Sequence, residues 1–175
     1  TVSVFEGTPP VVKVFDDAEA EQAGVAEWFA QRLKDGLKPH EIGVFVRAKP
    51  QMERALAAVK AAKVPAVELG EDVETRSGHV AVSTMHLAKG LEFRAVAVMA
   101  CDDEVIPLQE RVESVSDESD LEEVYNTERH LLYVACTRAR DHLLVTGVEP
   151  ASEFLDDLQL ENHVTVQSPK PQAMP

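Results

Sequence analysis

The chain has 175 residues, of which 45% are hydrophobic and 27% are charged, and its formal net charge at pH 7 is −14. Length and composition are those of one globular domain. The net negative charge argues against a protein that binds nucleic acid through a broad basic surface, because such binding depends on neutralising phosphates. No apolar run approaches the roughly 20 residues that span a bilayer, so we expect no membrane segment.

The acidic side chains are concentrated in one segment. Residues 102–123 contain ten acids and a single base, Arg111, and so account for nine of the fourteen net negative charges. The rest of the chain is only mildly acidic, so its charge does not exclude a local contact with DNA. We expect residues 102–120 to form a polar, mobile, solvent-exposed insertion.

The two cysteines, Cys101 and Cys136, lie in apolar segments without a CxxC pattern or a histidine partner. We interpret them as small buried hydrophobic side chains in a reducing cytoplasm rather than as metal or redox groups. No second histidine or acid lies at metal-ligand spacing from His86, so no metal site is predicted.

Apolar periodicity predicts alternating strands and helices in the first half of the chain. The expected strands are residues 11–15, 41–47 and 64–69, and the expected helices are residues 18–33 and 51–63. This order predicts parallel βαβ units with right-handed crossovers.

The second half continues the same pattern. The expected elements are strands at 80–85, 95–100 and 142–146, and helices at 121–139 and 151–158. We therefore predict a doubly wound α/β domain over residues 1–163, with three αβα layers and a mostly parallel sheet. Residues 164–175, with three prolines, are expected to form a flexible tail.

The segment from 84 to 93 reads T-M-H-L-A-K-G-L-E-F and lies between two expected strands. We expect the Glu92 carboxylate to project from the mouth of the sheet, where it can accept hydrogen bonds from ribose hydroxyls. The alternative is a surface acid that pairs with Lys89 or Arg94. Gly90 either needs a positive φ or lets a ligand approach the backbone closely.

Three further side chains of this segment carry hydrogen-bonding groups. Thr84 and His86 are expected to point to one side of the strand, where they can contact phosphate oxygens or a base of a single strand. A lone histidine beside a sheet is otherwise a structural group. Lys89 suits a phosphate contact and an ion pair with a neighbouring acid about equally.

A second dense segment, residues 127–140, reads T-E-R-H-L-L-Y-V-A-C-T-R-A-R. Leu131, Ala135 and Arg138 lie at helical spacing, so we expect one stripe that ends in a guanidinium at the edge of the core. The alternative is an arginine near a helix C-terminus that pairs with Asp141.

The neighbouring polar residues are given structural roles. Thr137 and Tyr133 are expected to support helix packing, and Glu128 and Arg129 to form ion pairs on the helix surface. Arg47, at the end of an apolar strand, suits structural ion pairing as well as ligand contact.

Together, T-x-H-x-x-K-G-L-E-F followed by E-R-x-L-L-Y-V-A-x-T-R-A resembles motifs V and VI of the UvrD/Rep family of superfamily 1 DNA helicases. The resemblance implies a RecA-like fold and the second RecA-like domain (2A) of such an enzyme. It implies that Glu92 contacts the nucleotide sugar and that Arg138 reaches the γ-phosphate as an arginine finger. It assigns Thr84 and His86 to the DNA strand and implies 3′→5′ movement.

The candidate nucleotide-binding residues are therefore Gly90, Glu92 and Arg138, and the candidate DNA-binding residues are Thr84, His86 and Lys89. No P-loop, G-x-x-x-x-G-K-[ST], occurs in the chain. The family has it in the N-terminal RecA-like domain of the same polypeptide, which would bind most of the ATP and Mg²⁺. We therefore expect the 175 residues alone not to hydrolyse ATP.

One departure and one alternative remain. The strand E-I-G-V-F-V-R that ends at Arg47 resembles the family's less specific motif IVa. Larger family members insert a further domain, called 2B, between motif IVa and motif V, and here residues 48–78 leave no room for it. The alternative function is a non-catalytic RecA-like module that binds a basic partner through the acidic insertion.

Overall fold

The computed structural model describes residues 9–72 and 74–162. The tail expected at 164–175 lies outside these residues, as does residue 163, the predicted end of the domain. No helix of the described part is long and apolar enough to cross a membrane.

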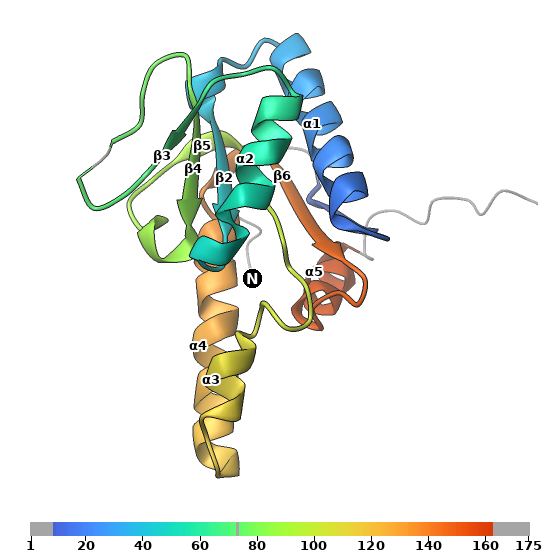
Figure 1. Ribbon diagram of the computed structural model, residues 1–175, viewed down its shortest axis with the longest axis vertical. Coiled ribbons are helices and arrows are strands. Elements are labelled where there is room, and N and C mark those ends of the chain that lie inside the picture. Colours follow the sequence, from blue (N-terminus) through green and yellow to red (C-terminus); the bar gives the residue numbers. More distant parts are fainter. Residues whose placement is uncertain (1–8, 73, 163–175) are drawn as a thin grey trace, which may run out of the picture.

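The domain is built on one six-stranded sheet with strand order β1-β6-β5-β2-β4-β3 (Figure 1). All strand pairings in the sheet are parallel. The strands are β1 (Val11–Phe15), β2 (Ile42–Val46), β3 (Ala66–Glu68), β4 (Val80–Thr84), β5 (Phe93–Val98) and β6 (Ala139–Val148).

Helices cover both faces of this sheet (Figure 1). They are α1 (Ala18–Lys34), α2 (Met52–Ala61), α3 (Gln109–Glu113), α4 (Glu118–Cys136) and α5 (Phe154–Asn162), with short 3₁₀ helices η1 (Pro39–Glu41), η2 (Lys49–Gln51) and η3 (Met85–Leu87). Phe29 of α1 and Val59 of α2 pack with the sheet in one core cluster, whereas Leu132 of α4 and Phe154 of α5 belong to the other. The predicted three-layer α/β fold is confirmed.

The central strand explains why the sheet could be predicted. All five residues of β2 are buried, as expected for a parallel strand covered on both faces. Such strands are continuous apolar runs and not alternating ones, and the sequence shows this run clearly.

Helix α4 lies three residues earlier than predicted. It begins after Asp117, whose side chain accepts a hydrogen bond from the Asp120 backbone N–H at 2.8 Å. It ends at Cys136, with Thr137 as the C-cap. Arg138 therefore lies in the turn to β6 and not on the helix, because β6 already begins at Ala139.

The connection from β4 to β5 decides where the first motif lies. Thr84 ends β4 next to Val46, at the carboxyl edge of the sheet. Phe93 begins β5 next to Ala139, at the amino edge. Residues 85–92 therefore run back across the sheet, and buried Met85 and Ala88 anchor them in the core cluster under α4.

The position expected for Glu92 was consequently wrong. The residue precedes β5 at the amino edge, whereas the mouth of a parallel sheet lies at the carboxyl ends of its strands. A parallel sheet requires this return, since each strand must start at the same edge as its neighbour.

The acidic insertion is also more ordered than predicted. Ile106 and Pro107 are buried, and the Ser152 hydroxyl donates a hydrogen bond to the Ile106 carbonyl. Asp102 accepts hydrogen bonds from Arg54 and from the Val148 backbone N–H. Apolar side chains thus anchor the start of the segment, whereas α3 and the first half of α4 extend away from the sheet (Figure 1).

A buried carboxylate joins the layers on the α1 side. Glu21 is fully buried and accepts hydrogen bonds from Arg54 Nη2 at 2.6 Å and Nε at 3.1 Å. It also accepts from the Ala100 backbone N–H at 3.0 Å and the Thr146 hydroxyl at 2.8 Å. One side chain therefore connects α1, α2, the end of β5 and β6.

We expect Glu21→Ala to lower the free energy of unfolding by about 3–5 kcal/mol, because it leaves buried partners without their carboxylate. Glu19→Ala, an exposed acid two residues earlier, should change it by less than about 0.5 kcal/mol. Urea unfolding followed by circular dichroism measures both. Equal effects of the two substitutions would contradict the assigned role of Glu21.

Candidate functional site

Glu92 and Arg138 lie together at the amino edge of β5 and β6. The Phe93 backbone N–H donates to the Arg138 carbonyl at 2.9 Å, and Arg138 Nη1 donates to the Leu91 carbonyl at 3.4 Å. Glu92 is thus flanked by two residues that both contact Arg138. The Glu92 side chain is exposed and Arg138 is half-buried, so the two groups share one open edge.

Neutral oxygens hold the guanidinium of Arg138. Its Nε donates to the Val134 carbonyl at 3.1 Å, and its Nη2 lies 3.3 Å from the Thr137 hydroxyl. These contacts cap the C-terminal end of α4, which agrees in part with the helix-terminus alternative. The ion pair expected in that alternative was wrong, because Asp141 accepts from Arg94 at 2.8 Å instead.

No ion pair joins Arg138 to a carboxylate within the described part of the chain. Backbone and hydroxyl dipoles orient its positive charge, and none of the described carboxylates neutralises it. Such a group is suited to meet an anionic oxygen supplied from outside the domain.

Glu92 forms an ion pair with neither Lys89 nor Arg94, the two partners expected if it is only a surface acid. Its Oε1 lies 3.2 Å from Arg140 Nε, and both side chains are more than half exposed. Arg94 pairs with Asp141 and Glu41 instead. An exposed pair of this kind contributes about 0–1 kcal/mol, so the Glu92 carboxylate remains available to a ligand.

Gly90 and Lys89 lie in the tight turn before Glu92. Gly90 has φ +84°, and a Cβ built on it would meet no heavy atom within 4 Å. Backbone conformation therefore explains the glycine without any close contact in this domain. Lys89 is exposed and forms no ion pair with any residue that the structure describes.

Thr84 and His86 lie at the opposite, carboxyl edge of the sheet. Thr84 ends β4, and η3 begins at Met85, so the strand alternation assumed for the pair does not extend to His86. Met85 is nevertheless buried between them, while Thr84 is half-buried and His86 exposed. Thr84 and His86 thus lie at the edge opposite to Glu92 and Arg138, and residues 85–92, which include Lys89, join the two edges.

His86 is held by an arginine from a different element. Its Nε2 lies 3.0 Å from Arg47 Nη1. Because a guanidinium can only donate, this ring nitrogen must be the acceptor. Arg47 is buried at the end of β2, so its role here is structural.

Glu128 fixes Arg47 in turn, and its expected place on the helix surface was wrong. The carboxylate is fully buried, with its two oxygens 2.8 and 3.1 Å from Arg47 Nε. It also accepts from the Leu108 backbone N–H at 2.6 Å, and Arg111 Nη1 lies at 3.5 Å. A signal existed in the sequence, because Glu128 lies four residues after Val124 on the buried stripe of α4.

Of the remaining residues of the second motif, Thr137 stabilises the end of α4, whereas Tyr133 and Arg129 lie at its surface. Thr137 donates to the Val134 carbonyl at 2.9 Å, as expected of a residue that supports the helix end. Tyr133 was expected to do the same but is 59% exposed. Arg129 lies over the Phe154 ring and pairs with Asp157 at the helix surface.

Both cysteines are buried, as predicted, and neither forms a disulfide. Burial raises the pKa of the Cys101 thiol well above its usual range, which keeps it protonated. Among residues 9–72 and 74–162, no group of three histidine, cysteine or acidic side chains is arranged to hold a metal ion.

The family of the chain follows from this geometry together with comparison to known proteins. Residues 46–149 match the family model of the UvrD-like helicase C-terminal domain. These residues run from the last residue of β2 through both motifs to the end of β6, which is more than half of the chain. The chain therefore belongs to this family, and the resemblance inferred from the two motifs is confirmed.

Curated relatives are bacterial DNA helicases. The chain is 38% identical over 77 residues to the ATP-dependent DNA helicase PcrA of Staphylococcus epidermidis, covering 44% of this chain and 10% of that protein. It is 40% identical over 99 residues to the ATP-dependent DNA helicase UvrD1 of Mycobacterium leprae, covering 50% and 12%. For the PcrA of Staphylococcus aureus the values are 32% over 121 residues, 60% and 16%. The chain thus spans only a small part of these relatives.

A solved structure shares the fold. It is the crystal structure of the C-terminal domain of a possible DNA helicase from Lactobacillus plantarum WCFS1. The TM-score is 0.62 at 24% identity, and the match covers 87% of this chain and 83% of that one.

A histidine near the amino edge makes stability depend on pH. Desolvation, reinforced by the charge of Arg32, lowers the pKa of His142. Arg32 Nη1 lies 3.3 Å from His142 Nδ1, which must therefore accept. Asp141 and Asp35 act in the opposite direction and do not reverse the shift.

The folded domain therefore favours neutral His142, and the unfolded chain binds its proton more readily. This contribution to stability is present above pH about 6.5, the usual pKa of histidine, and is lost as the pH falls to the lower folded pKa. We expect Tm to fall between pH 7.5 and pH 5.5, and to fall less in His142→Gln. An identical pH dependence of Tm in both proteins would contradict the assignment.

Proposed function

We propose that this chain is the C-terminal motor domain of an ATP-dependent DNA helicase or translocase. The observation that carries the proposal is the shared amino edge of Glu92 and Arg138, where the arginine has no carboxylate partner in the described structure. Membership of the UvrD-like family and relatives named ATP-dependent DNA helicases support it.

At this edge the domain would complete a nucleotide site. ATP and Mg²⁺ would be held mainly by the P-loop of the N-terminal RecA-like domain of the same polypeptide. Arg138 would approach the γ-phosphate as an arginine finger and stabilise charge that develops during phosphoryl transfer. Glu92 would accept hydrogen bonds from the ribose, with Gly90 shaping the turn that presents it.

At the opposite edge the domain would contact single-stranded DNA. There Thr84 suits phosphate oxygens, and the exposed His86 suits a base. Lys89 lies further along the crossover, in the turn before Glu92, and suits a phosphate oxygen of the same strand. The Arg47–Glu128 pair would keep that ring in place. Since residues 85–92 connect the two edges, closure around the nucleotide would shift the grip on the strand. The resemblance implies that translocation is 3′→5′.

In a protein where this domain is joined to its P-loop domain, we expect Arg138→Ala to lower the ATPase kcat by about 10³-fold or more. Nucleotide binding should change little, because the P-loop domain would supply most of the contacts. Steady-state ATPase assays and equilibrium binding of a fluorescent ATP analogue measure the two effects. The purified 175-residue chain alone should show no turnover.

The matched control is Arg129→Ala, which removes an exposed arginine of α4 away from this edge. It should leave kcat within about twofold, as expected of a surface substitution away from a site. Unaltered turnover in Arg138→Ala would exclude the arginine-finger assignment. The non-catalytic alternative, in which the acidic segment binds a basic partner, requires that no P-loop domain precede this one in its natural polypeptide.

For the DNA contact we expect His86→Ala to weaken binding of a labelled oligothymidylate by about tenfold, since stacking of a base contributes about 1–3 kcal/mol. Fluorescence anisotropy of the joined protein at fixed salt measures the affinity. His130→Ala, which removes another exposed histidine, should leave the affinity nearly unchanged. If both substitutions weaken binding equally, His86 has no specific role.

A further inference from the structure

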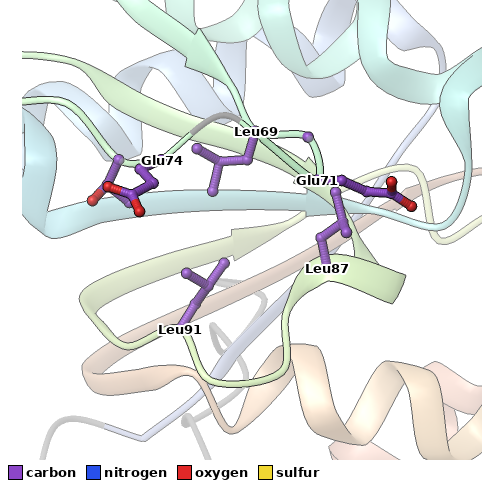
Figure 2. A pocket seen from close by; sticks show the side chains of 7 residues that line it. Leu69, Glu71, Glu74, Leu87 and Leu91 are labelled. Atoms are coloured by element: carbon purple, nitrogen blue, oxygen red, sulfur yellow. The ribbon is translucent and has the colours of Figure 1, made fainter.

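A pocket of about 360 Å³ opens beside the crossover of the first motif (Figure 2). Leu69, Leu87 and Leu91 surround its central space, and Glu71 and Glu74 lie on either side. Gly70 and Thr75 complete the described lining. Its volume is within the range of about 300–1,000 Å³ that is usual for binding pockets.

The leucines are held in place by the fold. The Leu69 backbone N–H donates to the Val82 carbonyl at 2.8 Å and so continues the pairing of β3 with β4. Leu91 is fixed through its N–H to the Ala88 carbonyl at 3.1 Å and through its own carbonyl to Arg138. Leu87 belongs to η3. Backbone hydrogen bonds thus fix the positions of the leucines that form the apolar floor of the pocket.

The charge around the pocket restricts what can bind there. Its described lining contains two carboxylates and no basic side chain. Residues 68–74 contain four acids and no base, so the surrounding segment is negative too. The two rim carboxylates disfavour a phosphate inside the pocket itself, whereas Arg76 and Lys89 lie close to lining residues in the sequence but are not part of the lining. A cationic partner with an apolar centre matches both the floor and the rim.

We propose that this pocket is a docking site for a protein segment that carries a large apolar side chain flanked by lysines or arginines. The apolar side chain would enter between the three leucines, and the basic groups would pair with Glu71 and Glu74. An apolar anchor within a polar rim is the usual arrangement of an interaction hot spot.

Occupancy would have a direct consequence for the motif. Leu87 adjoins His86, and Leu91 adjoins Glu92, so one bound side chain would touch both ends of residues 85–92. The partner would therefore bias the segment that joins the two candidate sites. The docking itself does not depend on the proposed helicase function and can fail or hold independently of it.

The test uses a fluorescein-labelled peptide of sequence KRLKLRK and fluorescence anisotropy at physiological ionic strength. The double variant Glu71→Lys/Glu74→Lys should weaken binding by at least about tenfold, because like charges then face the peptide. The control Glu118→Lys/Glu122→Lys makes the same change of net charge on exposed residues of α4. It should weaken binding by less than about twofold, since exposed charges far from the peptide are screened by salt. Equal losses would show only bulk attraction and overturn the proposal.

The apolar half of the proposal has its own readout. A peptide in which serine replaces both leucines should lose most of the affinity at unchanged charge. In methyl-labelled protein, the resonances of Leu69, Leu87 and Leu91 should shift with KRLKLRK and not with the serine peptide. Full binding of the serine peptide overturns docking in the pocket. If oligothymidylate shifts Leu69 and KRLKLRK does not, docking in the pocket is also overturned and a nucleobase is identified as the occupant. A shift of Leu87 alone is expected from DNA bound at the neighbouring His86.

Discussion

The buried pair between Arg47 and Glu128 is the contact on which the arrangement of the motifs depends. It joins the end of β2 to the middle of α4, and through Leu108 and His86 it also holds the start of the acidic segment and η3. A buried pair adds little stability over well-packed apolar residues, but losing one partner leaves an uncompensated charge. The pair therefore acts chiefly by selecting one position for α4 and η3.

A parallel sheet imposes the second constraint. Because β4 and β5 run in the same direction, the chain must return from one edge to the other within residues 85–92. The return separates Thr84 and His86 from Glu92 and Arg138 and connects them through one short segment. Buried Met85 and Ala88 allow so short a crossover, since the segment itself packs on the sheet.

Much of the fold could be read from local patterns, but some placements could not. Continuous apolar runs such as β2 identify buried parallel strands, and the motif residues identify the family. Four predictions were wrong. They concerned where α4 ends, at which edge Glu92 lies, whether Glu128 is exposed, and whether Tyr133 packs against the domain. Glu128 is buried because of Arg47, 81 positions away, and the hydrogen bond from Phe93 to Arg138 lies where α4 has ended and β6 begins.

The sequence by itself determined the alternation of strands and helices, the class of fold and the family, because each of these is encoded in runs of neighbouring residues. Only the tertiary structure decided that Thr84 and His86 lie at the edge opposite to Glu92 and Arg138. It also decided that carbonyl oxygens hold Arg138 with no carboxylate partner among the described residues, and that leucines from two separate segments form a pocket. These features arise from contacts between residues tens of positions apart. Composition and spacing restrict such contacts but do not select among them.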